Sequence, residues 1–301
     1  MKKTTFLCFI LFAMALQGQN KLLSSIDEFY DGANWHYSSG ANYEYDSNNN
    51  LISETELDWN FINSKWENSA KIIYTYDMSI NKVTNALYQN WNSTNNMFEN
   101  FYQTNYTYDG GKITESVNQS LVNGIWENED KTSFIYDGVL IDEVFDYNWN
   151  GAWVVEYRYT PTYNGNNRFE TILIDDWDND NSMWISADRQ TFTYDGNNRL
   201  AMNTYETFED PNWVEDAKTE YTVDANGNRE KEVNTYGGDT EEENYVYDTN
   251  FLMSNFAHPF KEKTGLDYIV EDFPYYNKLL STNDGDGGRT TYNYESAIIL
   301  G

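Results

Sequence analysis

Paired tryptophans are the residues of this chain whose type and spacing best suit ligand binding. A tryptophan ring offers a large flat apolar face with one polar edge, which is a surface that can stack on a sugar ring. The pairs flank short turn-like segments, and they are Trp59 with Trp66, Trp149 with Trp153, and Trp177 with Trp184, followed by the single Trp213. They can stack on a surface glycan, or they can staple the ends of hairpins into the core. We favour the structural interpretation and keep the glycan interpretation as the alternative.

Closely spaced aspartates give the only metal-binding pattern in the sequence. They are Asp176, Asp178 and Asp180 in one segment, and Asp284 and Asp286 in another. The first set has the alternating spacing that opens an EF-hand calcium loop. However, Asn181 replaces the glycine needed at the sixth position, and Ala187 replaces the glutamate that closes the loop. A looser calcium site at either segment is the single cofactor hypothesis, and a solvated aspartate turn is the preferred interpretation.

The sequence offers little for catalysis. Its two histidines, His36 and His258, lie in unrelated segments without metal-ligand spacing, and its single cysteine, Cys8, lies in the apolar N-terminal run. No serine stands in a nucleophile-elbow motif, and no glycine-rich phosphate loop is present. A glycosidase needs paired carboxylates, but a chance pair is expected among 49 acidic residues. We therefore predict that the protein is not an enzyme.

The N-terminus has the organisation of a secretory signal peptide. Lys2 and Lys3 precede the apolar run 6–16, and the small Gly18 stands at the expected cleavage site. The apolar run is shorter than the ~18 residues that a membrane-spanning helix needs, and no later run approaches that length. We expect residues 1–19 to be removed and the mature chain to be secreted or held at the cell surface, with the periplasm as the other destination and without a membrane span.

The chain is strongly acidic, with 49 aspartates and glutamates, 19 lysines and arginines, and a formal net charge of −30. This charge repels phosphate backbones, so we exclude nucleic acid as a partner. High charge can indicate disorder, but 17% of the residues are aromatic, and disordered chains are poor in aromatics. The composition therefore predicts a folded protein. It leaves the partner open, and the candidates are a surface glycan and another surface protein.

A repeat determines where the paired tryptophans lie. An aromatic residue is followed eleven positions later by the Asp or Asn of a Tyr-X-Tyr-Asp-like turn, and this spacing occurs seven times. The aromatic residues are Trp35, Trp66, Phe98, Trp126, Trp153, Trp184 and Trp213, and the turn residues are Asp46, Asp77, Asp109, Asp137, Asn164, Asp195 and Asp224. The interval back to the next aromatic varies from 16 to 21 residues, so length changes are confined to one half of the unit. A fixed long strand, a turn and a variable return strand would produce this pattern.

Alternation along the fixed strand predicts which residues share a face. Counting every second residue from Trp66 reaches Tyr74 and Tyr76, so we expect the aromatic start and the tyrosine pair of each strand on one side of the sheet. Five units carry a base at the same place on the other side, and these are Lys71, Lys131, Arg158, Arg189 and Lys218. The sequence thus predicts an aromatic face and an opposite polar face with cross-strand charge pairs.

Turns rich in Asn, Asp and Gly follow the tyrosine pairs, as in DSNNN, DGNNR and DANGN, and these residues tolerate the positive φ of tight hairpins. We predict an all-β fold, an antiparallel meander of about eight two-stranded hairpin repeats forming an elongated, twisted and rolled sheet. The sequence does not decide whether this sheet closes. The predicted boundaries are a signal peptide at 1–19, an N-terminal cap at 20–34, the repeats at 35–255 and a C-terminal capping segment at 256–301.

The turn strings carry a resemblance to a known family. The string TYDGNNRL at 193–200 resembles the YD repeats of RHS-type surface and toxin-shell proteins, and the segments 163–169 and 223–229 are similar to it. The resemblance covers residues 35–250, although the unit here is longer than the usual YD unit. The whole chain looks most like the Tyr/Trp/Asn-rich secreted repeat proteins of Bacteroidetes, of the kind associated with type IX secretion. This resemblance implies a surface, adhesive or shell role without catalysis.

The function we expect is a non-catalytic extracellular or cell-surface repeat scaffold, engaged in adhesion or protein interaction. The alternative is a carbohydrate-binding module that uses exposed Trp and Tyr rows. A transmembrane barrel is a third interpretation, because such barrels have a signal peptide, long strands and girdles of aromatic residues, as this sequence does. Its outer face must be apolar in the middle, whereas one face here carries Asn68, Asn100, Asp130 and Asp188 at mid-strand and the other carries the row of bases. We therefore set that reading aside.

Overall fold

Antiparallel strands, joined in chain order, make up the structure. A computed structural model of the protein describes residues 21–261 and 275–294. Within these residues the strands are β1 (Ser24–Tyr30), β2 (Trp35–Tyr45), β3 (Leu51–Asn60), β4 (Lys65–Asp77), β5 (Lys82–Asn92), β6 (Met97–Asp109), β7 (Lys112–Val122), β8 (Ile125–Asp137), β9 (Leu140–Trp149), β10 (Trp153–Tyr163), β11 (Phe169–Asp178), β12 (Met183–Tyr194), β13 (Leu200–Glu209), β14 (Asn212–Val223), β15 (Arg229–Tyr236), β16 (Asp239–Leu252), β17 (Asn277–Asp284) and β18 (Gly288–Asn293). Two short 3-10 helices, η1 (Met253–Asn255) and η2 (Pro259–Lys261), follow β16. The prediction of an all-β fold is confirmed.

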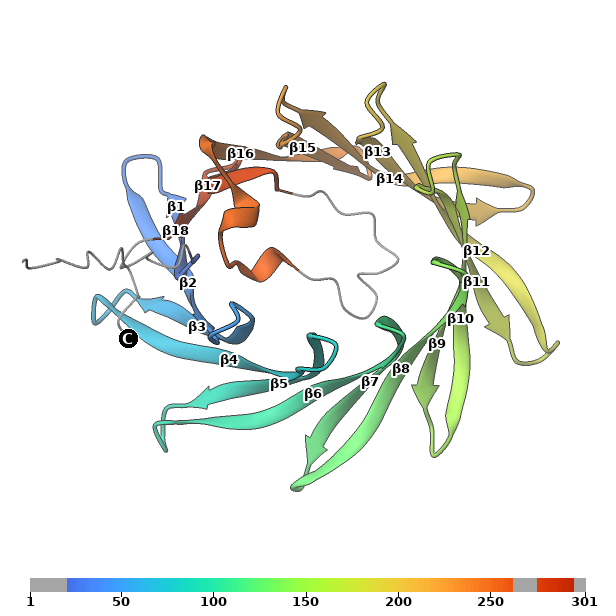
Figure 1. Cartoon of the computed structure of the whole chain (residues 1–301), viewed down its shortest axis with the longest axis horizontal. Helices are drawn as coiled ribbons and strands as arrows, with labels where there is room; N and C mark the ends of the chain where they lie inside the picture. The colour runs from blue at the N-terminus through green and yellow to red at the C-terminus, as the bar shows by residue number, and fades with distance from the viewer. Residues whose placement is uncertain (1–20, 262–274, 295–301) are drawn as a thin grey trace, which may run out of the picture.

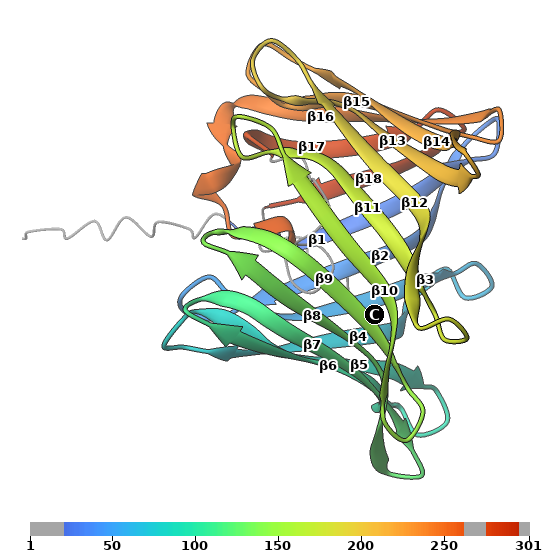
Figure 2. The ribbon, with the colours of Figure 1, turned by 90° about the vertical axis from the view of Figure 1, so that its right-hand side faces the viewer.

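The sheet closes on itself. Each strand pairs with the next, and β1 pairs with both β2 and β18, so the described strands form one 18-stranded antiparallel barrel (Figure 1). The prediction of an elongated, rolled sheet of hairpin repeats is therefore wrong. A twisted sheet of this width must curl, and closure pairs the two edges that an open sheet would expose. Figure 2 shows the strands crossing the wall of the barrel at a tilt, as closure of a sheet requires.

A β-bulge interrupts each of the seven long strands that begin with the repeated aromatic. In β4, Ala70 and Asn68 pair with consecutive residues of β3, so Ser69 is the extra residue, three positions after Trp66. The extra residue has the same place in all seven strands, and the set is Ser38, Ser69, Phe101, Glu129, Glu156, Ala187 and Asp216. A one-residue shift of alternation exchanges the two faces. The prediction that Trp66 and its tyrosine pair share a face is therefore wrong.

The Tyr-Asp turns fasten one end of the barrel. After β12, the Asp195 Oδ1 atom accepts hydrogen bonds from the backbone N–H groups of Asn197 and Arg199, at 2.8 and 2.9 Å. The preceding Tyr194 hydroxyl donates to the carbonyl of Phe169, 2.8 Å away at the start of β11. Hydroxyls at the equivalent place make the same bond near the start of an earlier odd-numbered strand, and they belong to Tyr76, Tyr108, Tyr163 and Tyr247. Each tyrosine thus ties its hairpin to the previous one.

Two apolar clusters lie against the inside of the barrel. One runs along the strands from β7 to β13, and its members are Ile113, Phe134, Ile141, Val144, Phe169, Ile172, Ile174, Phe192 and Leu200. The other joins the wall to η1, because Met253 and Phe256 pack with Ala41, Tyr43 and Tyr294. Figure 1 shows η1 and η2 within the ring of strands, so the segment that holds them covers the inner wall near β2.

The segments predicted as caps lie side by side. β1 falls in the predicted N-terminal cap (20–34), and β17 and β18 fall in the predicted C-terminal capping segment (256–301). β1 and β18 pair with each other and complete the barrel. The predicted signal peptide at 1–19 lies outside the described residues. Within the described part of the chain, no helix has the length and apolar character needed to cross a membrane.

Candidate functional site

The segment inside the barrel identifies the inner face of the wall. Phe260 of η2 lines a cavity together with Tyr43 of β2 and Glu54 of β3, so side chains with this alternation point inward. The strand pairings carry the same face from Glu54 to Tyr88 of β5 and then to Tyr102 of β6. The tyrosine half of each repeat strand therefore faces inward, and the half that begins with the repeated aromatic faces outward. These two faces are called the inner wall and the outer wall below.

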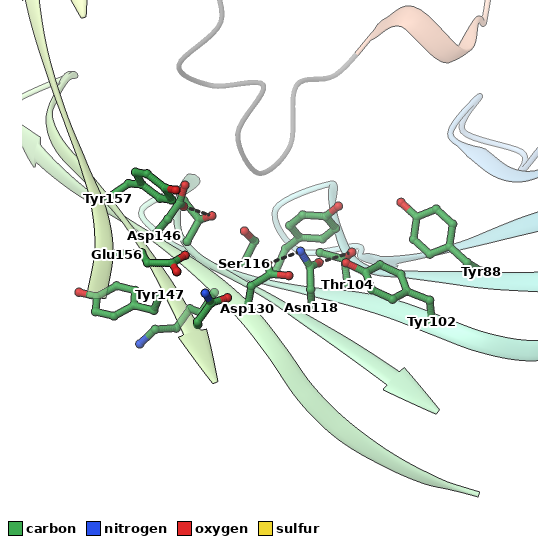
Figure 3. Close-up of a pocket in the computed structure, with 14 residues that line it drawn as sticks. Tyr88, Tyr102, Thr104, Ser116, Asn118, Asp130, Asp146, Tyr147, Glu156 and Tyr157 are labelled. Carbon is green, nitrogen blue, oxygen red and sulfur yellow. Dashed lines mark hydrogen bonds between the residues drawn. The ribbon is translucent and has the colours of Figure 1, made fainter. Parts of the chain in front are cut away.

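A cavity of about 520 Å³ opens along the inner wall between β5 and β10. This volume falls in the range of small-ligand sites. Figure 3 shows most of its labelled side chains gathered on one side of the strands, toward the interior. Tyrosines, hydroxyls, amides and carboxylates line it, and the residues are Tyr88, Tyr102, Thr104, Tyr106, Ser116, Asn118, Asp130, Lys131, Thr132, Asp146, Tyr147, Asn148, Glu156 and Tyr157. We call this space the tyrosine cavity.

Hydrogen bonds between neighbouring strands position the polar groups of the tyrosine cavity. The Thr104 hydroxyl donates to Asn118 Oδ1 at 2.7 Å, and Asn118 Nδ2 donates to Asp130 Oδ1 at 2.6 Å. In the next strands, the carboxylate of Asp146 accepts from the hydroxyl of Thr132 at 2.6 Å and from that of Tyr159 at 2.9 Å. Each carboxylate is thus fixed by neutral donors on adjacent strands.

Burial and mutual repulsion make these carboxylates harder to ionise. Burial raises the pKa of Asp130, and the charge of the neighbouring Glu129 raises it further, against the hydrogen bond from Asn118. Burial also raises the pKa of Asp146, and the charges of Asp130 and Glu156 add to that rise. Negative charge therefore concentrates in the tyrosine cavity at a free-energy cost to the folded state.

A second cavity, of about 340 Å³, lies where the inner segment meets the wall at β1 to β3. Burial raises the pKa of Glu54 to about 7, and the charge of Glu56 adds to the rise. The nearby Asp27 carboxylate accepts hydrogen bonds from the hydroxyls of Ser39 and Thr290, each at 2.7 Å. Phe260 of η2 lines this cavity, so the segment inside the barrel forms part of its wall.

The tryptophans predicted as stacking residues lie on the outer wall and pack against other aromatics. The distances between ring centroids are 5.2 Å for Trp59 and Trp66, 4.9 Å for Trp149 and Trp153, 5.0 Å for Trp177 and Trp184, and 5.0 Å for Trp213 and Phe208. Bases lie over some of these rings, since the guanidinium of Arg158 is 4.9 Å from the Trp184 centroid and that of Arg189 is 4.7 Å from the Trp213 centroid. The prediction that bases and tryptophans occupy opposite faces is therefore wrong, because the bulges bring both to the outer wall.

The aspartates predicted as weak calcium ligands serve mainly in turns. Asp178 Oδ1 accepts the backbone N–H groups of Asp180 and Asn181, and Asp284 Oδ1 accepts that of Asp286 at 3.1 Å. Asp176 lies on the inner wall, where burial raises its pKa, with added repulsion from Asp188 and Asp175. Across residues 21–261 and 275–294, no group of three His, Cys, Asp or Glu side chains is close enough to hold a metal ion.

The bulge is the reason that sequence reasoning missed the tyrosine cavity. Strict alternation places Asp130 on the same face as Trp126. The extra residue Glu129 shifts the alternation and puts the two side chains on opposite faces. The bulge has a constant place in the repeat, three residues after each aromatic. The residue types at that position range from Ser and Ala to Phe and Glu, so they do not reveal a bulge by composition.

Comparisons with known proteins find only distant similarity. No family model matches the chain, and a search of curated proteins finds no match. Similar solved structures include a protein of unknown function from Bacteroides fragilis, with 19% identity, 42% of this chain and 94% of that chain covered, and a TM-score of 0.34. A porin-like protein from Bacteroides uniformis has 9% identity, coverage of 92% and 97%, and a TM-score of 0.43. A Tc holotoxin pore from Photorhabdus luminescens has 9% identity, coverage of 73% and 14%, and a TM-score of 0.33. The neighbours thus include an RHS/YD-repeat-related toxin and a porin-like protein, and at these values no function is transferred from them.

Proposed function

We propose that the protein is a non-catalytic extracellular or cell-surface scaffold that engages a partner molecule, in adhesion or protein interaction, at its inner wall. The observation that carries the proposal is the tyrosine cavity, with its volume of about 520 Å³. Its polar groups are bonded across strands, as where Asn118 links Thr104 to Asp130. A wall whose side chains are already positioned loses little conformational freedom when a partner binds.

The carbohydrate-binding alternative uses different rings. Trp149 on the outer wall is 39% exposed, which leaves ring surface for a sugar to contact. The remaining predicted tryptophans are half-buried and contact aromatic or basic neighbours, as Trp184 does with Trp177 and Arg158. The inner-wall proposal and the glycan alternative therefore differ in which wall binds.

The test compares ligand-induced stabilisation of two variants. The inner-wall variant combines Tyr102→Leu with Tyr157→Leu, and the outer-wall control is Trp149→Leu. Neutral oligosaccharides, aliphatic amines and peptides are screened by thermal shift, and the mass of each retained probe is measured after incubation. We expect a probe that stabilises the wild type and the outer-wall control, that fails to stabilise the inner-wall variant, and that is recovered with its mass unchanged.

Two other outcomes contradict the proposal. Stabilisation by an oligosaccharide that is lost only in Trp149→Leu would support the carbohydrate alternative at the outer wall. A probe recovered cleaved or modified would show turnover, and the protein would then be an enzyme. A variant that no longer unfolds cooperatively is replaced by Tyr157→Leu alone, since Tyr157 is 39% exposed and its loss disturbs packing least.

Export belongs to the same proposal. The predicted signal peptide at 1–19 would deliver the chain to the cell surface or the medium. Expression of the full sequence in a Gram-negative host should yield a chain whose N-terminus, read by mass spectrometry, starts near residue 20 outside the cytoplasm. Recovery of the uncleaved chain from the cytoplasm would contradict this part of the proposal.

A further inference from the structure

The two walls divide the charges of the repeat strands. The mid-strand bases lie on the outer wall beside carboxylates: Lys131 Nζ is 3.3 Å from Glu115, and Arg158 Nη2 is 2.7 Å from Asp175. Lys131 reaches the edge of the tyrosine cavity, but its ammonium group lies 4.5 Å from the ring centroid of Tyr147 and beside Glu115. The positive charges of these strands are thus matched on the outer wall.

The carboxylates of the tyrosine cavity have neutral hydrogen-bond donors instead. Asp130 on β8 accepts from Asn118, and Asp146 on β9 accepts from Thr132 and Tyr159. Glu156 on β10 lines the same space. The negative charge of the cavity is therefore spread over three neighbouring strands, and the donors that fix it carry no compensating charge.

The tyrosine rings distinguish this cavity from a simple acidic surface. Tyr88 and Tyr102 both line the cavity, and their rings meet edge to face with centroids 5.4 Å apart and an interplanar angle of 67°. Tyr157 contributes a further ring and is 39% exposed. The face of an aromatic ring attracts a cation, such as a lysine ammonium, through its quadrupole, and cages of several rings recognise methylated ammonium groups.

Elsewhere on the inner wall, an arginine of the protein itself already lies between tyrosine rings and a carboxylate. Arg229 on β15 lies over two tyrosine rings, 5.3 Å from the Tyr221 centroid and 5.1 Å from the Tyr245 centroid. It also forms an ion pair with the carboxylate of Glu232. A cation between tyrosine rings and a carboxylate is therefore an arrangement that this wall stabilises with its own side chain at β14 to β16.

We propose that the tyrosine cavity binds aliphatic ammonium groups, presented either by a free polyamine or by the lysine side chains of a peptide. The proposal rests on the proposed function, because it names the ligand chemistry of the same inner-wall site. Carboxylates on three strands suit a chain carrying several spaced amines better than a single ion. A neutral sugar would meet the hydroxyls and amides but leave the repulsion between Asp130, Asp146 and Glu156 unrelieved.

The experiment measures binding by isothermal titration calorimetry at low and at physiological salt. The probes are spermidine, a pentalysine peptide, calcium chloride and the neutral trisaccharide maltotriose. The test variant is Asp130→Asn with Asp146→Asn, which removes two charges and keeps hydrogen-bonding groups of the same shape. The matched control is Glu44→Gln with Glu220→Gln, which removes two charges from exposed carboxylates of the outer wall, away from the cavity.

Support requires that spermidine or pentalysine binds the wild type, that affinity falls at least tenfold in the inner-wall variant, and that it changes less than twofold in the control. Affinity should also fall with added salt. Binding of spermidine alone identifies a free polyamine, and tighter binding of pentalysine identifies a peptide. Equal weakening in both double variants would overturn the proposal, because general attraction to an acidic protein would explain it.

A second variant pair tests the rings without changing charge. Tyr157→Phe should keep amine affinity within about threefold because the ring remains, and Tyr157→Leu should reduce it more strongly. Equal affinity in the two variants would overturn the role of the ring. The wild type could bind neither amine and yet bind another probe, with that binding abolished in Tyr102→Leu with Tyr157→Leu. This result would overturn the amine proposal and leave the proposed function standing.

Discussion

The two walls of the barrel come from the same strands but hold their charges in different ways. On the outer wall, Arg189 donates two hydrogen bonds to the Glu206 carboxylate, at 2.8 and 2.9 Å, and lies over the ring of Trp213. On the inner wall, Asp130 and Asp146 accept hydrogen bonds from neutral groups and lie among tyrosines. The outer-wall base is thus paired with a carboxylate, whereas these inner-wall carboxylates are held by neutral donors.

One extra residue per strand produces this difference. Without the bulge, the repeated aromatic and the tyrosine pair would lie together, and the bases would lie on the other face. With it, Trp184 joins Arg158 on the outer wall while Tyr194 stays with Phe169 on the inner wall. The bulge residue therefore separates the two walls, and its removal should abolish the difference between them.

Deletion of the bulge residue Ala187 should have the largest effect. Without it, either Trp184 must leave the outer wall or Phe192, which is 4% exposed, must leave the inner core. We expect a loss of unfolding free energy of about 4 kcal/mol or more, measured from the urea midpoint. The control is Ala187→Ser, because Ser69 has the equivalent place in β4. Equal midpoints for deletion and substitution would show that the bulge does not separate the walls.

Truncation of Trp184 should have the next largest effect and tests whether the tryptophan pairs hold the outer wall together. Trp184→Ala removes contacts with Trp177 and with Arg158, for which we expect a loss of about 3 kcal/mol. A double-mutant cycle with Trp177→Ala should give a coupling of about 1 kcal/mol. The control is Trp184→Phe, since Phe98 has the equivalent position in β6.

A different pair of results would favour the glycan interpretation of these rings. If Trp177→Ala and Trp184→Ala leave the urea midpoint unchanged but abolish retention on an immobilised glycan, the pair is a stacking platform. If stability falls and no glycan is retained by the wild type, the pair staples the hairpin. The two readouts are independent, so one purified variant set decides between the interpretations.

Local chemistry made much of the fold predictable, whereas the closure and the site depended on relations between distant residues. The turn at Asp195 and the eleven-residue spacing are local, and the strands and hairpins follow from them. Closure needs the register of β1 with β18, which are more than 250 residues apart in the sequence. The tyrosine cavity needs Asp130 and Tyr88 on one face, and a backbone irregularity at Glu129 decides the face of Asp130.

Neutralisation of Glu54 tests the inner wall through pH. Its pKa is raised from 4.5 to about 7, first by burial and then by Glu56, so the folded state holds the proton more tightly than the unfolded state does. Stability from this group is fully present below about pH 4.5 and is lost as pH rises to about 7. We expect Glu54→Gln to raise the free energy of unfolding at pH 8 by up to roughly 3 kcal/mol and to flatten its fall between pH 4.5 and 7.

The turn aspartates should show the opposite sign. Hydrogen bonds from Arg199 lower the pKa of Asp195, so the stability it contributes is present above its unfolded pKa and is lost as pH falls.

The control for Glu54→Gln is Glu44→Gln on the outer wall of β2, where the carboxylate accepts a hydrogen bond from the Ser53 hydroxyl. The melting temperature of each variant is measured from pH 4 to 8. An equal fall of the melting temperature in both variants would show that the buried inner carboxylate and the outer one respond to pH in the same way.

The smallest effect should come from breaking the outer ion pair between Lys218 and Glu220. This variant tests whether charge pairs alone stabilise the outer wall. The two groups are 3.1 Å apart, with side chains 30% and 52% exposed, so we expect Lys218→Met to change stability by less than about 1 kcal/mol. Arg189→Met, at the equivalent place, should cost about 2 kcal/mol, because it breaks a two-point bond to Glu206 and uncovers the Trp213 ring. Equal costs in urea unfolding would mean that the outer wall responds to net charge alone. A larger cost for Arg189→Met would mean that geometry, the stacked guanidinium with its paired carboxylate, is what distinguishes the outer wall from the inner one.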